Sequence, residues 1–172
     1  MKLMRAMGPW LLIALLAACS HPADPAVDTT SKAAASDLLV PPSRAEDLPA
    51  WRAFAGKVIL AETHDQDTHP YTFIVPPGDA AVAVEERKNI TSVIHSLLDQ
   101  TAVPSNMIAV TGADPELTAE VVAAAFHDVP ARSVPQLTVL YIGSAAGAEK
   151  ARGAVRAAGA DLRLRVLAPA KS

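Results

Sequence analysis

The feature that most constrains this chain is a regular alternation of β-prone runs with amphipathic segments toward its C-terminus. Residues 107–111, 137–142 and 161–167 read as strands, and a helical pattern separates each from the next. The run 137–142 is unbroken and apolar, so we place it at the centre of the sheet. Arg163 and Arg165 alternate with leucines in the last run, which indicates a charged edge strand. Strands joined through helices are parallel neighbours, so we predict an α/β domain with a three-strand parallel core.

The helices between these strands have recognisable ends. Asp114 is placed to cap one helix, and Pro115 suits its first turn. Gly143-Ser144 precedes the next helix, and Gly159 ends it. The residues expected to face the sheet are Leu117, Val121, Ala124 and Ala125 in the first helix and Ala148, Ala151, Val155 and Ala158 in the second. Small residues in the second helix allow it to pack closely on the sheet.

The region before residue 107 is less regular. Residues 58–61 and 71–75 are β-prone, and we predict that they form a hairpin joined by the polar loop 62–69, which would make the sheet mixed. Residues 80–88 fit either a helix or a strand. From Asn89 the pattern becomes helical, and its apolar face consists of Ile90, Val93, Ile94, Leu97 and Leu98.

Trp51 and Phe54 lie three residues apart, just before the first predicted strand. In a chain with few aromatic residues we expect them to cover the edge of the core. The alternative is that they anchor a partner protein, so both are candidate partner-binding residues.

The first eighteen residues have the features of a signal peptide. Lys2 and Arg5 precede a short apolar run, and Leu16-Ala17-Ala18 leads to Cys19, the only cysteine in the chain. The apolar run is too short to cross about 30 Å of hydrocarbon, which needs roughly 20 residues. Leu-Ala-Ala-Cys resembles the lipobox of bacterial lipoproteins. An uncleaved membrane anchor with a chance cysteine is the alternative.

The lipoprotein resemblance has several implications. It implies that Cys19 receives a diacylglycerol, that the chain is cut before this residue and that the new amino group is acylated. Serine rather than aspartate follows the cysteine, at Ser20. In that class of protein, the absence of aspartate at this position implies transport to the outer membrane. We expect the domain to face the periplasm. Several acyl chains anchor a protein firmly. With its one cysteine lipidated, the chain has none left for a disulfide.

Composition divides the remaining chain. Residues 19–48 are rich in proline, alanine, serine and aspartate and contain no aromatic residue, so we predict a disordered tether. Residues 49–168 are the predicted folded domain, and 169–172 a tail. Within the tether, Leu38-Leu39-Val40 is an apolar cluster that could instead order against a partner. The formal net charge of −3 at pH 7 argues against nucleic-acid binding.

The clearest cluster of ligand-type side chains is in the loop 62–69. Its candidate metal ligands are His64, Asp65, Asp67 and His69, which suit zinc or copper. No cysteine or third histidine lies near them in the sequence, so a solvated loop is the competing reading. We therefore assign no metal and no cofactor to the chain.

Other patterns do not predict catalysis. The strand ends at 111–114 and 143–147 lack the lysine of a phosphate-binding loop, and we read them as helix caps. The chain has no Gly-x-Ser-x-Gly motif. We predict that the protein is not an enzyme.

One further resemblance concerns residues 140–163, which read Leu-Tyr-Ile-Gly-Ser-Ala-Ala-Gly-Ala-Glu-Lys-Ala-Arg-Gly-Ala-Val-Arg-Ala-Ala-Gly-Ala-Asp-Leu-Arg. This segment resembles the end of the Cag-pathogenicity-island type lipoproteins, which accompany type IV secretion and conjugation systems. Trp51-x-x-Phe54 and the lipobox are similar to that family too, and the resemblance extends over about the last two-thirds of the chain. It implies a structural lipoprotein with other envelope or secretion-system proteins as partners. The alternative function is a periplasmic ligand- or metal-binding lipoprotein that uses the loop 62–69.

Overall fold

The structure is a computed structural model that describes residues 39–63, 70–99 and 107–168. All of them belong to one compact unit, Ala33–Ser172. The elements, in chain order, are α1 (Leu48–Glu62), β1 (Tyr71–Val75), α2 (Ala81–Leu98), β2 (Met107–Gly112), α3 (Pro115–Ala125), β3 (Thr138–Gly143), α4 (Ala145–Ala157) and β4 (Asp161–Val166). This alternation confirms the predicted α/β class. Among the described helices, none is both long and apolar enough to cross a membrane.

The four strands form one parallel sheet in the order β1-β2-β3-β4. The register aligns Val110 of β2 with Tyr141 of β3, and Tyr141 with Leu164 of β4. β2 is buried at every residue, and β3 at all but its first. The prediction of three parallel neighbours with the 137–142 run inside the sheet is therefore confirmed.

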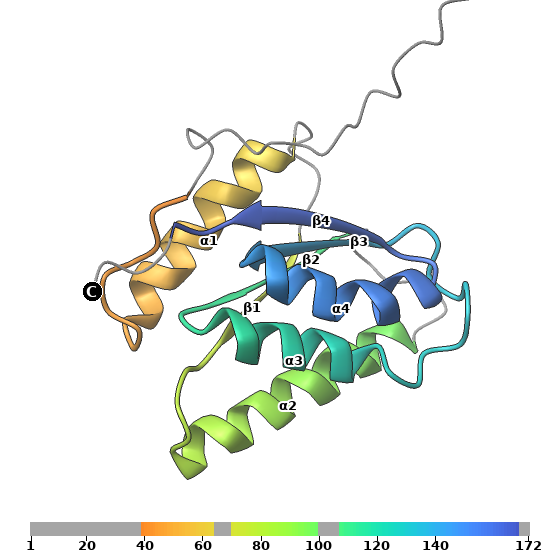
Figure 1. Cartoon of the computed structure of the whole chain (residues 1–172), viewed down its shortest axis with the longest axis horizontal. Helices are drawn as coiled ribbons and strands as arrows, with labels where there is room; N and C mark the ends of the chain where they lie inside the picture. The colour runs from red at the N-terminus through yellow and green to blue at the C-terminus, as the bar shows by residue number, and fades with distance from the viewer. Residues whose placement is uncertain (1–38, 64–69, 100–106, 169–172) are drawn as a thin grey trace, which may run out of the picture. The chain divides into compact units, whose positions relative to one another are not determined.

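The sheet separates two apolar layers (Figure 1). α2, α3 and α4 cover one face, where they enclose the larger core. The predicted small stripe of α4, Ala148, Ala151, Val155 and Ala158, is completely buried there. In α3 the prediction was partly wrong, because Ala124 is exposed while Thr118, Ala119 and Val122 are buried. α1 covers the other face, where Val58 and Ile59 pack against residues of β2 and β3.

The predicted strand at 58–61 is wrong, because these residues form the last turns of α1. Val58 and Ile59 follow Trp51 and Ala55 at helical spacing, and all four are buried. Packing of this face on the sheet outweighs the β-propensity of a short apolar run. There is consequently no hairpin before β1, and the described sheet is wholly parallel rather than mixed.

Residues 81–88, which the sequence left open, begin α2. A turn precedes this helix, and the Arg87 guanidinium fixes it by donating to the carbonyl oxygens of Pro76 (2.9 Å) and Gly78 (2.7 Å). The charged residues that obscured the pattern, Glu85, Glu86 and Lys88, are exposed.

The segment before α1 lies against the domain. Leu39 pairs in parallel with Leu167 just beyond β4, through hydrogen bonds of 3.0 Å to the Val166 oxygen and 2.7 Å from the Ala168 nitrogen. Its side chain packs with the apolar layer under α1. Residues 39–48, which the sequence assigned to the tether, therefore contact the folded domain, and Leu39 finds its partner within the chain.

Candidate functional site

The structure places only part of the predicted site. Trp51 and Phe54 are described, whereas Cys19, His64, Asp65, Asp67 and His69 lie outside the described residues. Glu62, the first residue of the loop 62–69, pairs with Arg165 of β4. Within the described ranges, no three histidine, cysteine or acidic side chains are grouped so that they could hold a metal ion.

Trp51 is a core residue rather than an exposed anchor. Its side chain is only 2% exposed, and its indole nitrogen donates to the Arg44 carbonyl oxygen at 3.2 Å. The Phe54 ring packs edge-on against it, with ring centroids 5.7 Å apart. The pair therefore ties the segment before α1 to the sheet layer.

The Tyr141 side chain lies near the carboxyl end of β3. Its hydroxyl donates to the Pro115 carbonyl oxygen at 2.7 Å, between the first turns of α3 and α4. The described strand order β1-β2-β3-β4 does not reverse, so it contains no topological switch point of the kind at which open parallel sheets bind ligands. Gly143 and Gly147 leave room for Tyr141, because a Cβ would overlap the ring at Gly143 and the hydroxyl oxygen at Gly147. Burial raises the pKa of Tyr141 to about 12.

No sequence motif predicts this role of Tyr141, although Gly143 and Gly147, close after it in the chain, are a signal of close packing. The capping prediction is confirmed. The Asp114 carboxylate accepts hydrogen bonds from the Glu116 nitrogen (2.9 Å) and the Leu117 nitrogen (3.1 Å). Ser144 caps α4 by accepting from the Gly147 nitrogen at 2.9 Å.

Two of the three basic side chains of α4, Lys150 and Arg152, pair with acidic neighbours, whereas Arg156 forms no ion pair with a described residue. Lys150 lies 2.8 Å from Glu120 of α3, and that hydrogen bond raises the pKa of Lys150. Arg152 lies 2.8 Å from Glu149. This face of α4 is therefore largely neutralised within the domain.

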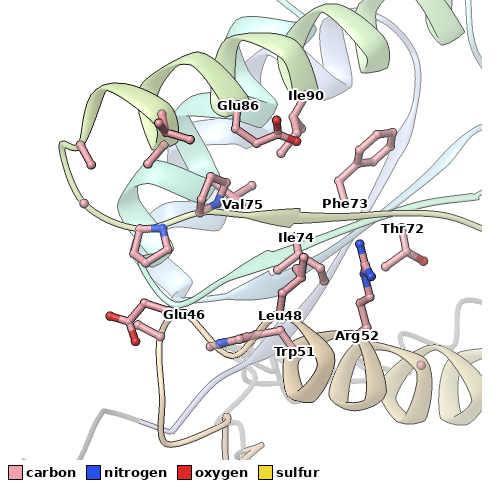
Figure 2. A pocket seen from close by; sticks show the side chains of 18 residues that line it. Glu46, Leu48, Trp51, Arg52, Thr72, Phe73, Ile74, Val75, Glu86 and Ile90 are labelled. Carbon is pink, nitrogen blue, oxygen red and sulfur yellow. The ribbon is translucent and has the colours of Figure 1, made fainter.

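A groove of about 1030 Å³ runs along the free edge of β1. Figure 2 shows β1 crossing the groove between two helices. Its lining includes Leu48, Arg52 and Gly56 of α1 and Val82, Glu86 and Ile90 of α2. We call this cavity the β1 groove. No sequence motif predicts this groove, because it forms from elements that are separate in the sequence.

The two edges of the sheet differ in character. β4 exposes Arg163 and Arg165, as the sequence predicted, and Leu39 covers its end. β1 contains neither a charged residue nor a proline, and it pairs with β2 alone among the described strands. Natural proteins usually protect an edge strand with charges, proline or a covering segment. In the described part of the chain, only β4 has such protection.

Exposed apolar side chains gather on the helices beside β1. Five large apolar side chains are exposed in the described part of the chain, and four of them, Leu48, Leu60, Val82 and Val93, belong to α1 or α2. Val82 and Val93 lie on the side of α2 away from α3, because the opposite side carries His95, which contacts Ala125 of α3 at 3.1 Å. Of these four side chains, Leu48 and Val82 line the groove and give it exposed apolar positions on both helices.

The groove also carries charges that the domain does not neutralise. Glu46, Arg52 and Glu86 all line the groove and are exposed. None of them forms an ion pair with another described residue.

Comparisons of the chain with family models, with curated proteins and with solved structures give no match. By its fold and its groove, the chain is an α/β domain with one charged sheet edge and one open, apolar sheet edge.

Proposed function

We propose that this protein is a lipid-anchored outer-membrane lipoprotein, facing the periplasm, that acts as a structural and interaction component of an envelope assembly. A type IV secretion or conjugation system is the assembly that the sequence resemblance favours. The observation that carries the proposal is the β1 groove, where an uncharged edge strand lies between exposed apolar side chains of two helices. Such an edge is a template for pairing with another chain.

The place where the N-terminal segment meets the folded domain supports this arrangement. Leu39 lies beside β4, so the segment from Cys19 reaches the domain at the sheet edge opposite β1. For a tether of the kind that we predict from the sequence, roughly 20 residues span on the order of 25 Å root-mean-square. Lipid on Cys19 would therefore hold the domain near the membrane and leave the β1 groove accessible to another protein.

The proposal is tested by sizing the native complex after extraction of the outer membrane in mild detergent. Three chains are compared: the unaltered protein, Val82→Glu in the groove and Ala157→Glu on α4 as the control. Both side chains are exposed, that of Val82 at 83%, so neither substitution disturbs the core. Ala157 does not line the groove.

We expect the unaltered protein and Ala157→Glu to elute in a large particle with stoichiometric partners, and Val82→Glu to elute largely as a lone lipoprotein. Elution of the unaltered protein as a lone lipoprotein would overturn the assembly function. Elution of Val82→Glu in the same large particle would show that the β1 groove is not the contact surface.

A further inference from the structure

We propose that the occupant of the β1 groove is a second copy of this chain, whose β1 pairs antiparallel with this β1 about a two-fold axis near Phe73. The two sheets then join into one continuous sheet. This inference rests on the proposed function, because it names the partner at the same surface. It goes beyond that function by fixing the symmetry and the register of the contact.

The sequence of β1 is complementary to itself in this register. Phe73 faces Phe73 of the second copy, Tyr71 faces Val75, and Thr72 faces Ile74. Aromatic pairs, aromatic with β-branched pairs and β-branched pairs are the favourable cross-strand neighbours in antiparallel sheets. Like charges do not meet, since the strand carries none.

The flanking helices allow this approach. A two-fold axis perpendicular to the sheet keeps each helix on its own face, so α1 lies beside α1 of the second copy and α2 beside α2. Gly56 of α1 has nothing within 4 Å of the position of a Cβ, which leaves open space on this wall of the groove. The exposed Leu48 and Val82 side chains gain apolar neighbours in such a contact.

Two of the three exposed charges of the groove, Arg52 and Glu46, complement each other in a two-fold contact, whereas Glu86 of α2 gains no opposite charge in it. In Figure 2, Arg52 lies at the Thr72 end of the groove and Glu46 toward the opposite end. Rotation about the axis exchanges these ends, so Arg52 of each copy comes to face Glu46 of the other. Both side chains lack an ion-pair partner among the described residues, and the two-fold arrangement supplies one to each.

The first test is photo-cross-linking in intact cells that produce two differently tagged copies of the full chain. A benzophenone amino acid replaces Thr72, which is exposed on β1. The control carries the same group at Ala157, an exposed position of α4. We expect a product of twice the chain's mass that carries both tags from Thr72, and none from Ala157.

Other outcomes separate the two proposals. A cross-linked product from Thr72 that contains a different protein and only one tag would contradict the proposal that the occupant is a second copy. It would still support the interaction function. The absence of any cross-linked product from Thr72 would also contradict the proposal of a second copy. If the unaltered chain also elutes alone from the outer-membrane extract, the interaction function fails as well.

The second test reverses the charges in the same cross-linking assay. Arg52→Glu and Glu46→Arg each place like charges opposite one another twice in the dimer, and we expect each to lower the yield about tenfold. The double variant restores opposite charges, so its yield should return close to that of the unaltered chain. A double variant with a yield as low as the single variants would overturn the proposed register.

Discussion

The Tyr141 hydroxyl donates a hydrogen bond to the Pro115 carbonyl oxygen across 2.7 Å and thereby joins β3 to the first turn of α3. The contact lies near the carboxyl end of β3, between the first turns of α3 and α4. It also satisfies the polar atom of a fully buried side chain.

Removal of this hydroxyl should destabilise the domain without changing its shape. In Tyr141→Phe the ring remains, but the Pro115 carbonyl loses its donor. We expect the free energy of unfolding to fall by about 1–2 kcal/mol, as measured by urea denaturation. An unchanged value would show that the hydrogen bond contributes nothing to stability.

The same residue predicts a loss of stability at alkaline pH. Burial raises the pKa of Tyr141 to about 12 in the folded protein, whereas the unfolded chain releases the proton near the ordinary tyrosine value of about 10. The contribution of the protonated Tyr141 to the free energy of unfolding is therefore complete below about pH 10. It is lost as the pH rises toward 12, at up to about 1.4 kcal/mol per pH unit. Urea denaturation across this range should show that Tyr141→Phe lacks this component. Equal slopes in both proteins would contradict the assignment.

Two glycines of α4 should respond oppositely to alanine. A Cβ at Gly147 would overlap the Tyr141 hydroxyl oxygen, whereas a Cβ at Gly153 meets nothing within 4 Å. We expect Gly147→Ala to cost about 1–3 kcal/mol of stability through overpacking. Gly153→Ala should instead gain about 0.5–1 kcal/mol from helix propensity.

A double variant identifies the cause of the Gly147 effect. Tyr141→Phe removes the overlapping oxygen, so the double variant should lose less stability than the sum of the two single losses. Strict additivity in thermal or urea denaturation would mean that the two residues do not clash.

The hydrogen bond of Trp51 should determine how readily residues 39–47 detach from the domain. In Trp51→Phe the hydrogen bond to the Arg44 carbonyl is lost, and we expect trypsin to cut after Arg44 several times faster. Cleavage after Arg163 in β4 reports global unfolding and serves as the internal reference. Phe54→Leu keeps the indole hydrogen bond and should leave the Arg44 rate nearly unchanged. Equal rates in Trp51→Phe and the unaltered chain would contradict this role.

The C-terminal half of the fold could be predicted because each local signal agreed with the packing. Asp114 and Ser144 cap the helices they precede, and the small stripe of α4 meets the sheet. α1 was mistaken for a strand because a short apolar run does not distinguish the two structures. Asp47 nevertheless gave the same signal as Asp114, since it accepts from the Ala50 nitrogen at 3.0 Å with a proline in the first turn.

The candidate site could not be predicted in the same way. The β1 groove combines residues near 46–56 with residues near 72–90, and the packing of α1 and α2 on opposite faces of the sheet, both in contact with β1, brings these segments together. Leu39 likewise found its partner at Leu167, far away in the sequence. Local patterns carry no information about such distant pairings.

The most direct measurement extracts the membrane in mild detergent and compares amide hydrogen exchange in the protein as extracted, where we propose that it is part of an assembly, with exchange in the dissociated protein. β1 (Tyr71–Val75) is the test segment, and the charged edge strand β4 (Asp161–Val166) is the internal reference. If the β1 edge joins the assembly, amides of β1 exchange much more slowly in the complex, and β4 exchanges at the same rate in both samples. Equal exchange of β1 in the two samples would contradict the account.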